Sequence, residues 1–389
     1  MLSFPWTISE VGDTPASIGE YGYLIHLLRC GIYGDIPEEI PKGMSFRNVY
    51  DYAMKHDVAN LAFYAVEKLR YPPESELYKT WSMRRDLALM RDMHQDFARS
   101  ELVEAFTKRG IPFKELQGTA LKKLYPAPEY RTMSDLDFIV EKSKLGQCGE
   151  ILTELGYHCK TQGDFEVDGV RSPNIFVEIH TDYFTETSEY FSVMNAPAFH
   201  CELTEKEKIT ELYLYNILHT AKHYYAGGCG IRRVLDMYYL DIFYARCIDE
   251  KYVNRVLGEA DLTVFASNLS ALAQSWFGEQ APGNISDAMV NYILSSGLHG
   301  TRENIINSKL RKESTDGKVT FWTKVKYIFG RLFPKKSVMI QKFPVLKKWG
   351  ILYPFLWIYR IISMISGKNR RAALKDLRLT IKSDKDVNL

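Results

Sequence analysis

The sequence lacks closely spaced cysteines. Its 389 residues contain only six, and no two of them form a Cys-x-x-Cys pair. They are Cys30, Cys148, Cys159, Cys201, Cys229 and Cys247. A disulfide framework or a zinc ribbon depends on cysteines at short, regular spacings, so the pattern favours neither. We expect buried thiols without disulfides, as in a protein of the reducing cytoplasm.

A secretory signal and a membrane-spanning run are also lacking. The opening Met1-Leu-Ser-Phe-Pro-Trp does not have the basic and then apolar order of a signal. The longest apolar stretch, Trp349 to Ile365, is interrupted by a glycine, a proline and Arg360, whereas a spanning helix needs about 20 apolar residues. Flanking lysines fit either a helix lying in a membrane interface or a helix docked on the protein body. We therefore expect a cytoplasmic protein whose only membrane contact would be peripheral.

A strong net charge is lacking as well, but the charges are unevenly distributed. The chain carries a formal charge of +2, yet from Lys309 onward 20 Lys or Arg face 5 Asp or Glu. The tail therefore carries +15, and the rest of the chain −13. The tail lysines and arginines that alternate with aromatic residues are Lys335, Lys336, Lys347, Lys348, Lys368, Arg370 and Arg371. Such a tail fits weak contact with an anionic membrane or a nucleic acid, or docking on the acidic body.

Hydrophobic residues make up 46% of the chain, which is enough for a large core. Apolar residues at helical spacing predict helices between residues 20 and 70, and one long helix from Ser75 to about Arg109 that ends at Gly110. The period then changes. Strands are predicted at Ile111–Leu116, Ser134–Val140, Phe165–Val170 and Ile175–Ile179, with helical turns at Thr119–Tyr125 and a helix at Ser143–Leu155.

Helical spacing returns after Thr204, where Thr204-Glu-Lys-Glu resembles a capping box. Further helices are predicted to about Ser296, with a glycine-rich loop at residues 226–230. We predict four regions: a helical N-terminal region at 1–104, an α/β core at 105–200, a helical domain at 201–308 and a basic helical tail at 309–389.

Three carboxylates form the candidate site. Side chains alternate along a strand, so Asp135 and Asp137 point to one face while Leu136 points to the core. Two neighbouring like charges repel unless a cation lies between them, and hard oxygen ligands suit Mg²⁺. Glu178 stands in the middle of another predicted strand, where an acidic residue between β-branched neighbours is unusual. The alternative is that all three are solvated residues of an exposed strand face.

These residues occur within a longer ordered set of motifs. Along the chain come Gly118-Thr119-Ala120-Leu121, Tyr125-Pro126, Arg131, Ser134-Asp135-Leu136-Asp137, Gly156-Tyr157 and Val177-Glu178-Ile179-His180. The order resembles the uncharacterised nucleotidyltransferases of the polymerase-β-like superfamily. The resemblance is strongest over residues 105 to 185. It implies an α+β fold in which a small mixed-sheet nucleotidyltransferase core is embedded between helical N- and C-terminal regions.

The resemblance also implies a chemistry. A Mg²⁺- or Mn²⁺-dependent enzyme would move a nucleoside monophosphate from a nucleoside triphosphate (NTP) to a hydroxyl of a small molecule, sugar or protein. Asp135, Asp137 and Glu178 would be both catalytic residues and metal ligands. The expected NTP-binding residues are Gly118, Thr119, Arg131 and Lys122. The family often has lysine before the glycine, but this chain has Gln117, so Lys114, Lys122 or Lys123 would have to supply the cation.

Other features leave alternatives open. Arg131 would bind triphosphate or form a structural salt bridge. His219 and His223, with Arg232 and Asp236, would line a substrate pocket, form a polar seam between helices or, for the histidines, bind zinc. His180 would support Glu178 by a hydrogen bond. Because of Gln117, a nucleotide-binding module without turnover is the alternative to an enzyme. The sequence makes no prediction of oligomeric state.

Overall fold

The computed structural model describes most of the chain. The described residues are 16–162, 165–184, 188, 190, 192–194, 203–278, 287–298, 300–312, 314, 319–334, 336, 339–340, 343, 345–365 and 369–382. Cys201, Lys335 and Lys368 lie outside them, and the side chains of Lys347, Arg370 and Arg371 are likewise outside the description. The chain forms two compact units, the first bounded by Met1–Ala221 with Gly230–Val290 and the second by Lys222–Cys229 with Asn291–Leu389.

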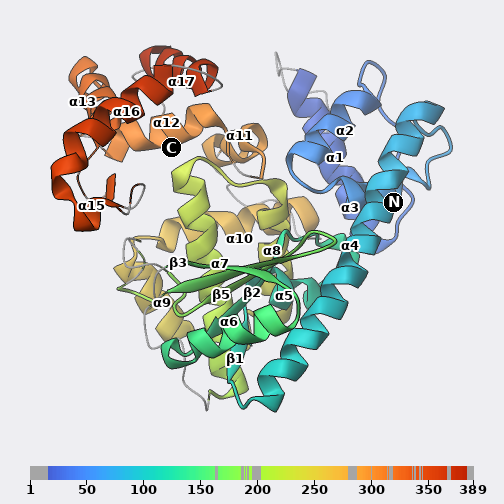
Figure 1. The fold of residues 1–389 in the computed structure, drawn as a ribbon. Coiled ribbons are helices and arrows are strands. Elements are labelled where there is room, and N and C mark those ends of the chain that lie inside the picture. Colours follow the sequence, from blue (N-terminus) through green and yellow to red (C-terminus); the bar gives the residue numbers. More distant parts are fainter. Residues whose placement is uncertain are drawn as a thin grey trace. The chain divides into compact units, whose positions relative to one another are not determined.

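A five-stranded mixed sheet lies at the centre of the first unit (Figure 1). Its strands are β1 Phe113–Glu115, β2 Asp135–Val140, β3 His158–Gln162, β4 Glu166–Arg171 and β5 Ile175–His180. Their order is β1-β2-β5-β4-β3. The two central strands, β2 and β5, are parallel, and every other pair is antiparallel. Strand alternation therefore gives β2 and β5 a shared apolar face and a shared polar face.

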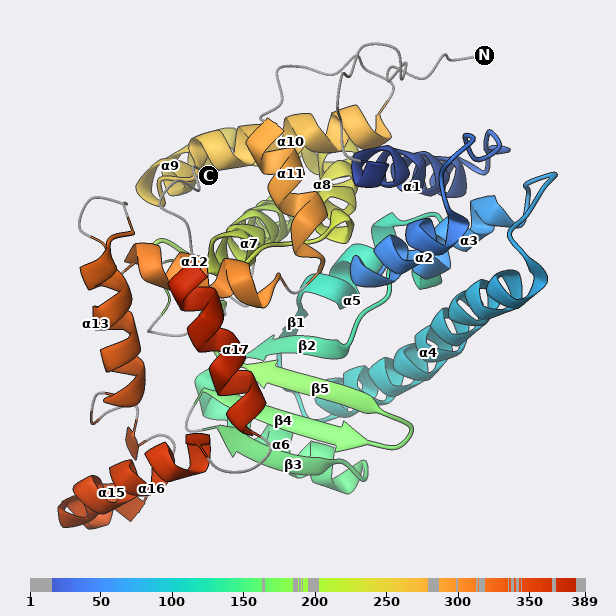
Figure 2. The same cartoon turned by 90° about the horizontal axis from the view of Figure 1, so that it is seen from above.

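The apolar face of the sheet packs on two helices, α4 Ser75–Lys108 and α6 Leu145–Glu154. Leu102 and Phe106 of α4 are fully buried against Leu136 and Phe138 of β2 in one hydrophobic cluster. Figure 2 shows the long α4 passing beside the sheet. Burial of apolar surface on this side leaves the opposite face of the sheet for polar chemistry.

Further helices complete the core region. Three of them precede α4, and the others connect the strands. They are α1 Ala16–Tyr33, α2 Phe46–Lys55, α3 Ala59–Val66, α5 Gln117–Leu121, η1 Lys122–Leu124, η2 Pro128–Tyr130 and η3 Lys142–Lys144. Trp81 of α4 is fully buried and donates a hydrogen bond from its indole nitrogen to the carbonyl of Ala59 at 2.7 Å, which ties α3 to α4.

Helices follow the sheet. They are α7 Glu205–Ala226, α8 Ile231–Tyr244, α9 Glu250–Glu259, α10 Thr263–Phe277 and α11 Asp287–Ser296. The predicted capping box is present, since the Glu207 amide donates to the Thr204 hydroxyl at 3.3 Å and the Thr204 amide donates to the Glu207 carboxylate at 2.8 Å.

The second unit is helical in its described parts. Its main elements are α12 Arg302–Lys312, α13 Phe321–Leu332, α15 Val345–Lys348, η4 Gly350–Leu352, α16 Tyr353–Ile365 and α17 Asn369–Lys382. Within the described ranges, every helix falls short of the length or hydropathy that a bilayer-spanning segment requires.

The predicted α+β class is confirmed, with a small mixed sheet flanked by helices on either side in the sequence. The sequence prediction missed β3, because its residues, His-Cys-Lys-Thr-Gln, are mostly polar and form an edge strand that pairs only with β4. The prediction that all cysteines are buried was also wrong, since Cys159 and Cys247 are exposed. The four predicted region boundaries stay predictions.

Candidate active site

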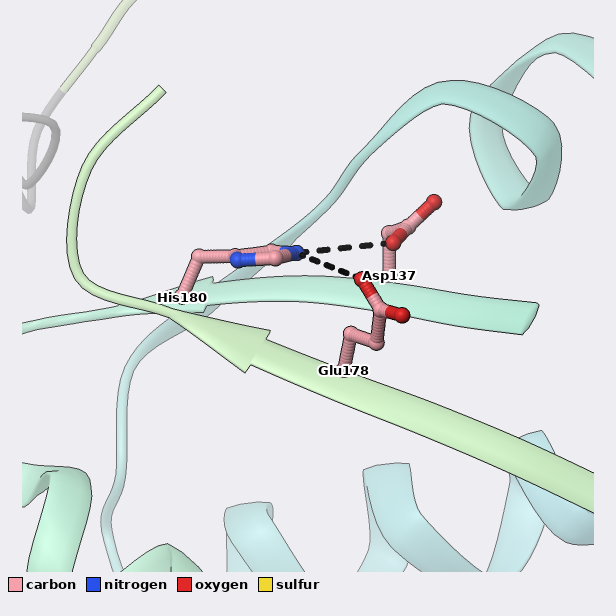
Figure 3. A group of neighbouring side chains, drawn as sticks. All are labelled: Asp137, Glu178 and His180. Carbon is pink, nitrogen blue, oxygen red and sulfur yellow. Dashed lines mark ion pairs between the residues drawn. The ribbon is translucent and has the colours of Figure 1, made fainter. Parts of the chain in front are cut away.

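Asp137 and Glu178 lie directly opposite each other on the two parallel central strands. In the β2–β5 register Asp137 pairs with Glu178, and Asp135 pairs with Phe176. Period-two alternation then places Asp135, Asp137, Glu178 and His180 on the polar face. Figure 3 shows Asp137, Glu178 and His180 pointing toward one another. The sheet thus brings together carboxylates that are 41 positions apart in the sequence.

The imidazole of His180 lies among three carboxylates. Its Nε2 atom is 3.5 Å from Asp137 Oδ1 and 3.6 Å from Glu178 Oε2, and its Nδ1 atom is 3.4 Å from Glu166 Oε2. Burial opposes the protonated ring, but hydrogen bonds to Asp137 and Glu166 outweigh it and raise the pKa of His180 to about 10. In the metal-free protein the imidazolium is therefore the counter-ion of the acidic cluster.

The close spacing of the carboxylates also raises the pKa of two of them. Burial, followed by the charge of Asp137, raises the pKa of Asp135 to about 6. Burial, followed by the charges of Asp137 and Asp135, raises the pKa of Glu178 to about 7. Both shifts arise because the deprotonated forms lose hydration and repel one another. A divalent cation would relieve this repulsion.

The polar face extends onto β4, which the sequence prediction did not include in the site. Glu166 pairs with His180 and Asp168 pairs with Glu178 in the β4–β5 register. Both acidic residues thus lie on the same face as the predicted cluster. The alternation in Glu166-Val-Asp168 could have indicated this from the sequence, because the segment was predicted as a strand and alternate residues of a strand lie on one face.

The donor set fits a divalent cation. One ligand atom each from Asp137, Glu178 and His180 lies within 4.8 Å of the other two. Asp137 is 7% exposed, whereas the Glu178 side chain is 40% exposed, so the group has a buried floor and an open side. Asp135, predicted as a ligand, is not part of this three-residue group, and His180, predicted only as a support, is. Mixed oxygen and nitrogen ligands suit several divalent metals.

The turn between β1 and α5 lies beside the acidic strand, since the Leu116 amide donates a hydrogen bond to the Asp137 carbonyl at 3.0 Å. Gly118 packs so closely that an added Cβ would lie 2.8 Å from Arg131 Nη1 and 2.9 Å from the Cβ of Met133. A glycine is required there. The next residue, Thr119, is fully buried, and its hydroxyl has no hydrogen-bond partner among the described residues. A buried hydroxyl without a partner is uncommon in proteins, which makes the start of α5 an unusual part of the fold.

Gln117 begins α5 with a φ of +40°, a left-handed conformation that is uncommon for residues other than glycine. Its side-chain amide is held by the helices opposite. Gln117 Nε2 lies 3.0 Å from the Tyr215 hydroxyl and 3.2 Å from His219 Nε2, and Arg233 Nη1 donates to Gln117 Oε1 at 3.4 Å. α7 and α8 thus fix the residue at the position where the resemblance led us to expect lysine.

The two cations predicted to bind NTP are both engaged by acidic residues. Arg131 donates to the two Asp236 carboxylate oxygens at 2.7 and 2.9 Å, and the Tyr125 hydroxyl donates to the same carboxylate at 2.7 Å. This is the structural salt bridge that the sequence left as the alternative. Lys122 Nζ donates to Asp92 Oδ1 at 2.8 Å. Burial raises the pKa of Asp236, but Arg131 outweighs burial, so the pKa is lowered overall.

Two further arginines lie next to this ion pair. Arg232 and Arg233 of α8 are each 8% exposed, and both interact electrostatically with Asp236. Arg232 donates to the Thr132 carbonyl at 2.8 Å and pairs with Asp57, while its Nε has no hydrogen-bond partner among the described residues. Arg232 also interacts with the Asp135 carboxylate. Guanidinium groups therefore border the acidic cluster, and the sequence prediction had not given them this role.

A cavity of about 370 Å³ adjoins the turn. It shares Leu116, Ala120 and Tyr215 with the surroundings of Gln117. Its other lining residues include the cations Arg99, Lys114 and Lys208, the acids Glu115 and Glu211, and the rings of Phe113 and Tyr183. Lys114 Nζ and the Tyr183 hydroxyl both donate to Glu211 Oε2, at 2.7 and 2.8 Å. The cavity combines aromatic walls with fixed polar groups, as small-molecule sites do.

The zinc interpretation of His219 and His223 gains no support, since no metal-binding group of three among the described residues contains either histidine. His219 instead stacks on Tyr215, with ring centroids 5.5 Å apart, and contacts Gln117. Of the three interpretations, the polar seam between elements describes His219 best.

Comparison with known proteins adds one match. A family model described as an uncharacterised nucleotidyltransferase matches residues 43–278, which is more than half of the chain. The matched range contains the whole sheet, the acidic cluster, the Gln117 turn and the arginines of α8. No curated protein and no solved structure matches the chain.

Proposed function

The chain belongs to the uncharacterised nucleotidyltransferase family, and from this we propose that it transfers a nucleoside monophosphate from an NTP to a hydroxyl group of an acceptor. In this reaction the acceptor oxygen attacks the α-phosphorus and the bond from that phosphorus to the β-phosphate oxygen breaks. Pyrophosphate leaves, and the hydroxyl proton passes to a base. The acceptor is a small molecule, a sugar or a protein side chain.

Asp137 and Glu178 would hold divalent metal together with His180, which lies in the same group, or with Asp135, which the family resemblance implies. Mg²⁺ or Mn²⁺ bound there would neutralise phosphate charge and lower the pKa of an acceptor hydroxyl. Of Asp137, Glu178 and His180, Glu178 has the most exposed side chain, at 40%. We therefore assign it to the acceptor side, where its carboxylate would orient the hydroxyl and accept the proton. Asp137, which is buried, would serve as the fixed ligand.

We assign the triphosphate to the turn and to α8. The backbone amides of Gly118 and Thr119 at the start of α5 would face phosphate oxygens. Arg232, which interacts with the Asp135 carboxylate, and Arg233, which reaches Gln117 of the turn, would supply the positive charge. The adjoining cavity would receive the part of a substrate that extends beyond the phosphates.

The observation that carries the proposal is the parallel pairing of β2 with β5, which sets Asp137 opposite Glu178 beside the turn that contains Gly118. Paired carboxylates are suited to holding the metal ions that stabilise the attacking and leaving oxygens in phosphoryl transfer. The family match supports nucleotidyl transfer as the reaction class.

The test is pyrophosphate release. Purified protein would be incubated with each labelled NTP, Mg²⁺ or Mn²⁺ and a panel of hydroxyl acceptors. We expect metal-dependent release that falls at least about 100-fold in Asp137→Asn, because a fixed charge at the reacting phosphate is lost. Glu154→Gln is the matched control, since this carboxylate lies on α6 and pairs with Arg109 away from the site.

Two outcomes would count against turnover. Release that is equal in wild type and Asp137→Asn would contradict the catalytic assignment. Tight, metal-dependent NTP binding without product for any acceptor would favour the alternative, a nucleotide-binding module, which the glutamine at position 117 motivates.

A further inference from the structure

The second unit turns large apolar side chains outward on three helices. On α13, Phe321 and Trp322 are 70% and 75% exposed, and Val325 and Phe329 continue the same stripe. On α16 the exposed stripe is Phe355, Ile358, Tyr359 and Ile362, at spacings of three and four. On α17 it is Leu374, Leu377 and Ile381. Isolated exposed apolar residues are ordinary, but three amphipathic stripes in one unit indicate an interaction surface.

The buried side of these helices is partly polar. Asp376 of α17 is 4% exposed and accepts hydrogen bonds from Arg302 and Arg331, and Thr380 on the same face is 2% exposed. Arg360 of α16 donates to the Arg331 carbonyl at 2.9 Å. A helix in a water-soluble unit normally buries its apolar face. Here these buried polar groups supplement a small apolar cluster around Ile306 and Leu310, and the larger apolar stripes remain outside.

The same segment is strongly basic. From Val319 to Lys382 the sequence has fifteen Lys or Arg and one acidic residue. That acidic residue is Asp376, which is buried and already paired with arginines. Exposed cations stand directly among the apolar stripes, with Lys326 on α13 and with Lys375 and Arg378 on α17. The exposed charge is therefore almost entirely positive.

We propose that the exposed faces of α13, α16 and α17, named here the apolar-basic surface, bind an anionic lipid bilayer. Apolar and aromatic side chains would enter the headgroup region while lysines and arginines contact lipid phosphates. α16 has 13 residues, whereas a spanning helix needs about 20, so it lies in the interface. This inference does not depend on the proposed transfer reaction.

Charge and side-chain type together favour a membrane over other partners. Nucleic acid would be attracted by the cations, but it would leave aliphatic side chains such as Ile358, Ile362 and Leu377 without apolar contacts. A second copy of the chain would match the apolar stripes but would bring a surface of the same sign. A bilayer with anionic headgroups satisfies both features of the surface.

The experiment is vesicle flotation of the full-length protein. We expect binding to vesicles of phosphatidylcholine with phosphatidylglycerol, little binding to phosphatidylcholine alone, and weaker binding when salt rises from about 0.1 to 0.5 M. Phe355→Ser with Ile362→Ser should lower the partition coefficient at least about tenfold. Lys375→Gln with Arg378→Gln should lower it about fivefold or more for each charge lost.

Met93→Ser with Phe97→Ser is the matched control. These residues of α4 are 64% and 65% exposed but belong to the first unit, and their loss should leave vesicle binding unchanged. Circular dichroism of each variant checks that its helices are retained.

The proposal fails under any of four results. The first is that the wild type does not bind anionic vesicles, and the second is that the α4 control loses as much vesicle binding as the variants of the apolar-basic surface. The third is that the protein binds RNA through its lysines and arginines but does not bind vesicles. The fourth is that it forms a salt-resistant dimer and does not bind vesicles. Pyrophosphate release is measured separately, so either proposal can fail alone.

Discussion

Gln117 combines two features at residue scale. Its backbone has a positive φ, and its amide is fixed by Tyr215, His219 and Arg233. A conformation that is costly for a residue with a Cβ persists only where the surroundings hold it, and such positions gather at functional sites. Arg233 reaches the same amide from α8. Position 117 itself has no cation, but Arg233, which is 116 residues further along the chain, places its guanidinium next to Gln117.

We predict that Arg233→Gln weakens NTP binding in the presence of Mg²⁺ by about 10- to 100-fold, because a hydrogen bond to a charged group contributes about 1.5–3 kcal/mol. Adding Gln117→Lys to this variant should restore much of the affinity, since lysine returns the charge from the turn. Titration calorimetry with ATP and with inorganic tripolyphosphate measures both effects.

Arg255→Gln is the control for the charge change, because Arg255 forms an exposed pair with Glu259 on α9. Unchanged affinity in Arg233→Gln, or no recovery in the double variant while the fold is retained, would remove Arg233 from the phosphate site.

Protonation of the acidic cluster gives a pH prediction. Without metal, the pKa values of Asp135 and Glu178 are about 6 and 7, whereas unfolded carboxyls titrate near about 3.9 and 4.3. The protonated forms therefore stabilise the metal-free fold at low pH, and this contribution is lost as pH rises through the folded values. Metal needs the deprotonated carboxylates, so its affinity changes in the opposite direction.

We expect Mn²⁺ affinity to rise steeply between about pH 5 and pH 8, with proton release on binding. Titration calorimetry in buffers of different ionisation enthalpy measures the protons released. A flat pH profile, or one that persists in Asp137→Asn, would show that metal binds elsewhere.

At the scale of elements, strand alternation explains most of what the sequence predicted about the site. Asp-Leu-Asp and Glu-Ile-His each put alternate residues on one face, and the structure places the two segments on adjacent parallel strands. β3 was missed because an edge strand with polar residues has no apolar alternation to detect. Without β3, the position of β4 inside the sheet was not apparent. The alternation of Glu166 and Asp168, although visible in the sequence, was therefore not connected with the cluster.

The start of α7 provides an element-scale prediction. Thr204→Ala removes the cap that pairs with Glu207 and should lower the free energy of unfolding by about 0.5–2 kcal/mol. Thr80→Ala is the control, since that hydroxyl lies in the second turn of α4 and donates back to the Glu76 carbonyl at 2.8 Å. Urea denaturation compares the two. Equal effects would mean that the cap contributes nothing specific.

At the scale of the whole molecule, the chain has two compact units of different character. The first contains the sheet and the acidic cluster, and the second contains the apolar-basic surface. Units with separate cores need not unfold together.

We predict two transitions in calorimetry of the full-length protein, of which ATP with Mg²⁺ moves only the one that belongs to the first unit. At a ligand concentration 100-fold above Kd, the stabilisation should be about 2.7 kcal/mol. Asp137→Asn should reduce this shift, and the α4 control should not. A single transition, or two that move equally with nucleotide, would contradict the assignment.

The sequence by itself determined the features that depend on local spacing. Period-two alternation set Asp135 and Asp137 on one face, the apolar repeat and Gly110 set the extent of α4, and the order of motifs indicated the family. The family model confirms that assignment.

Tertiary structure alone decided which side chains meet. Arg131 and Asp236 are 105 positions apart, and their buried pairing follows from packing α8 beside the sheet, because a buried guanidinium requires a carboxylate partner. The same packing brings Arg233 to Gln117. Local spacing specifies the face of a strand or helix on which a residue lies. Which charged side chains neutralise one another is decided only when segments that are distant in the sequence pack together in the interior.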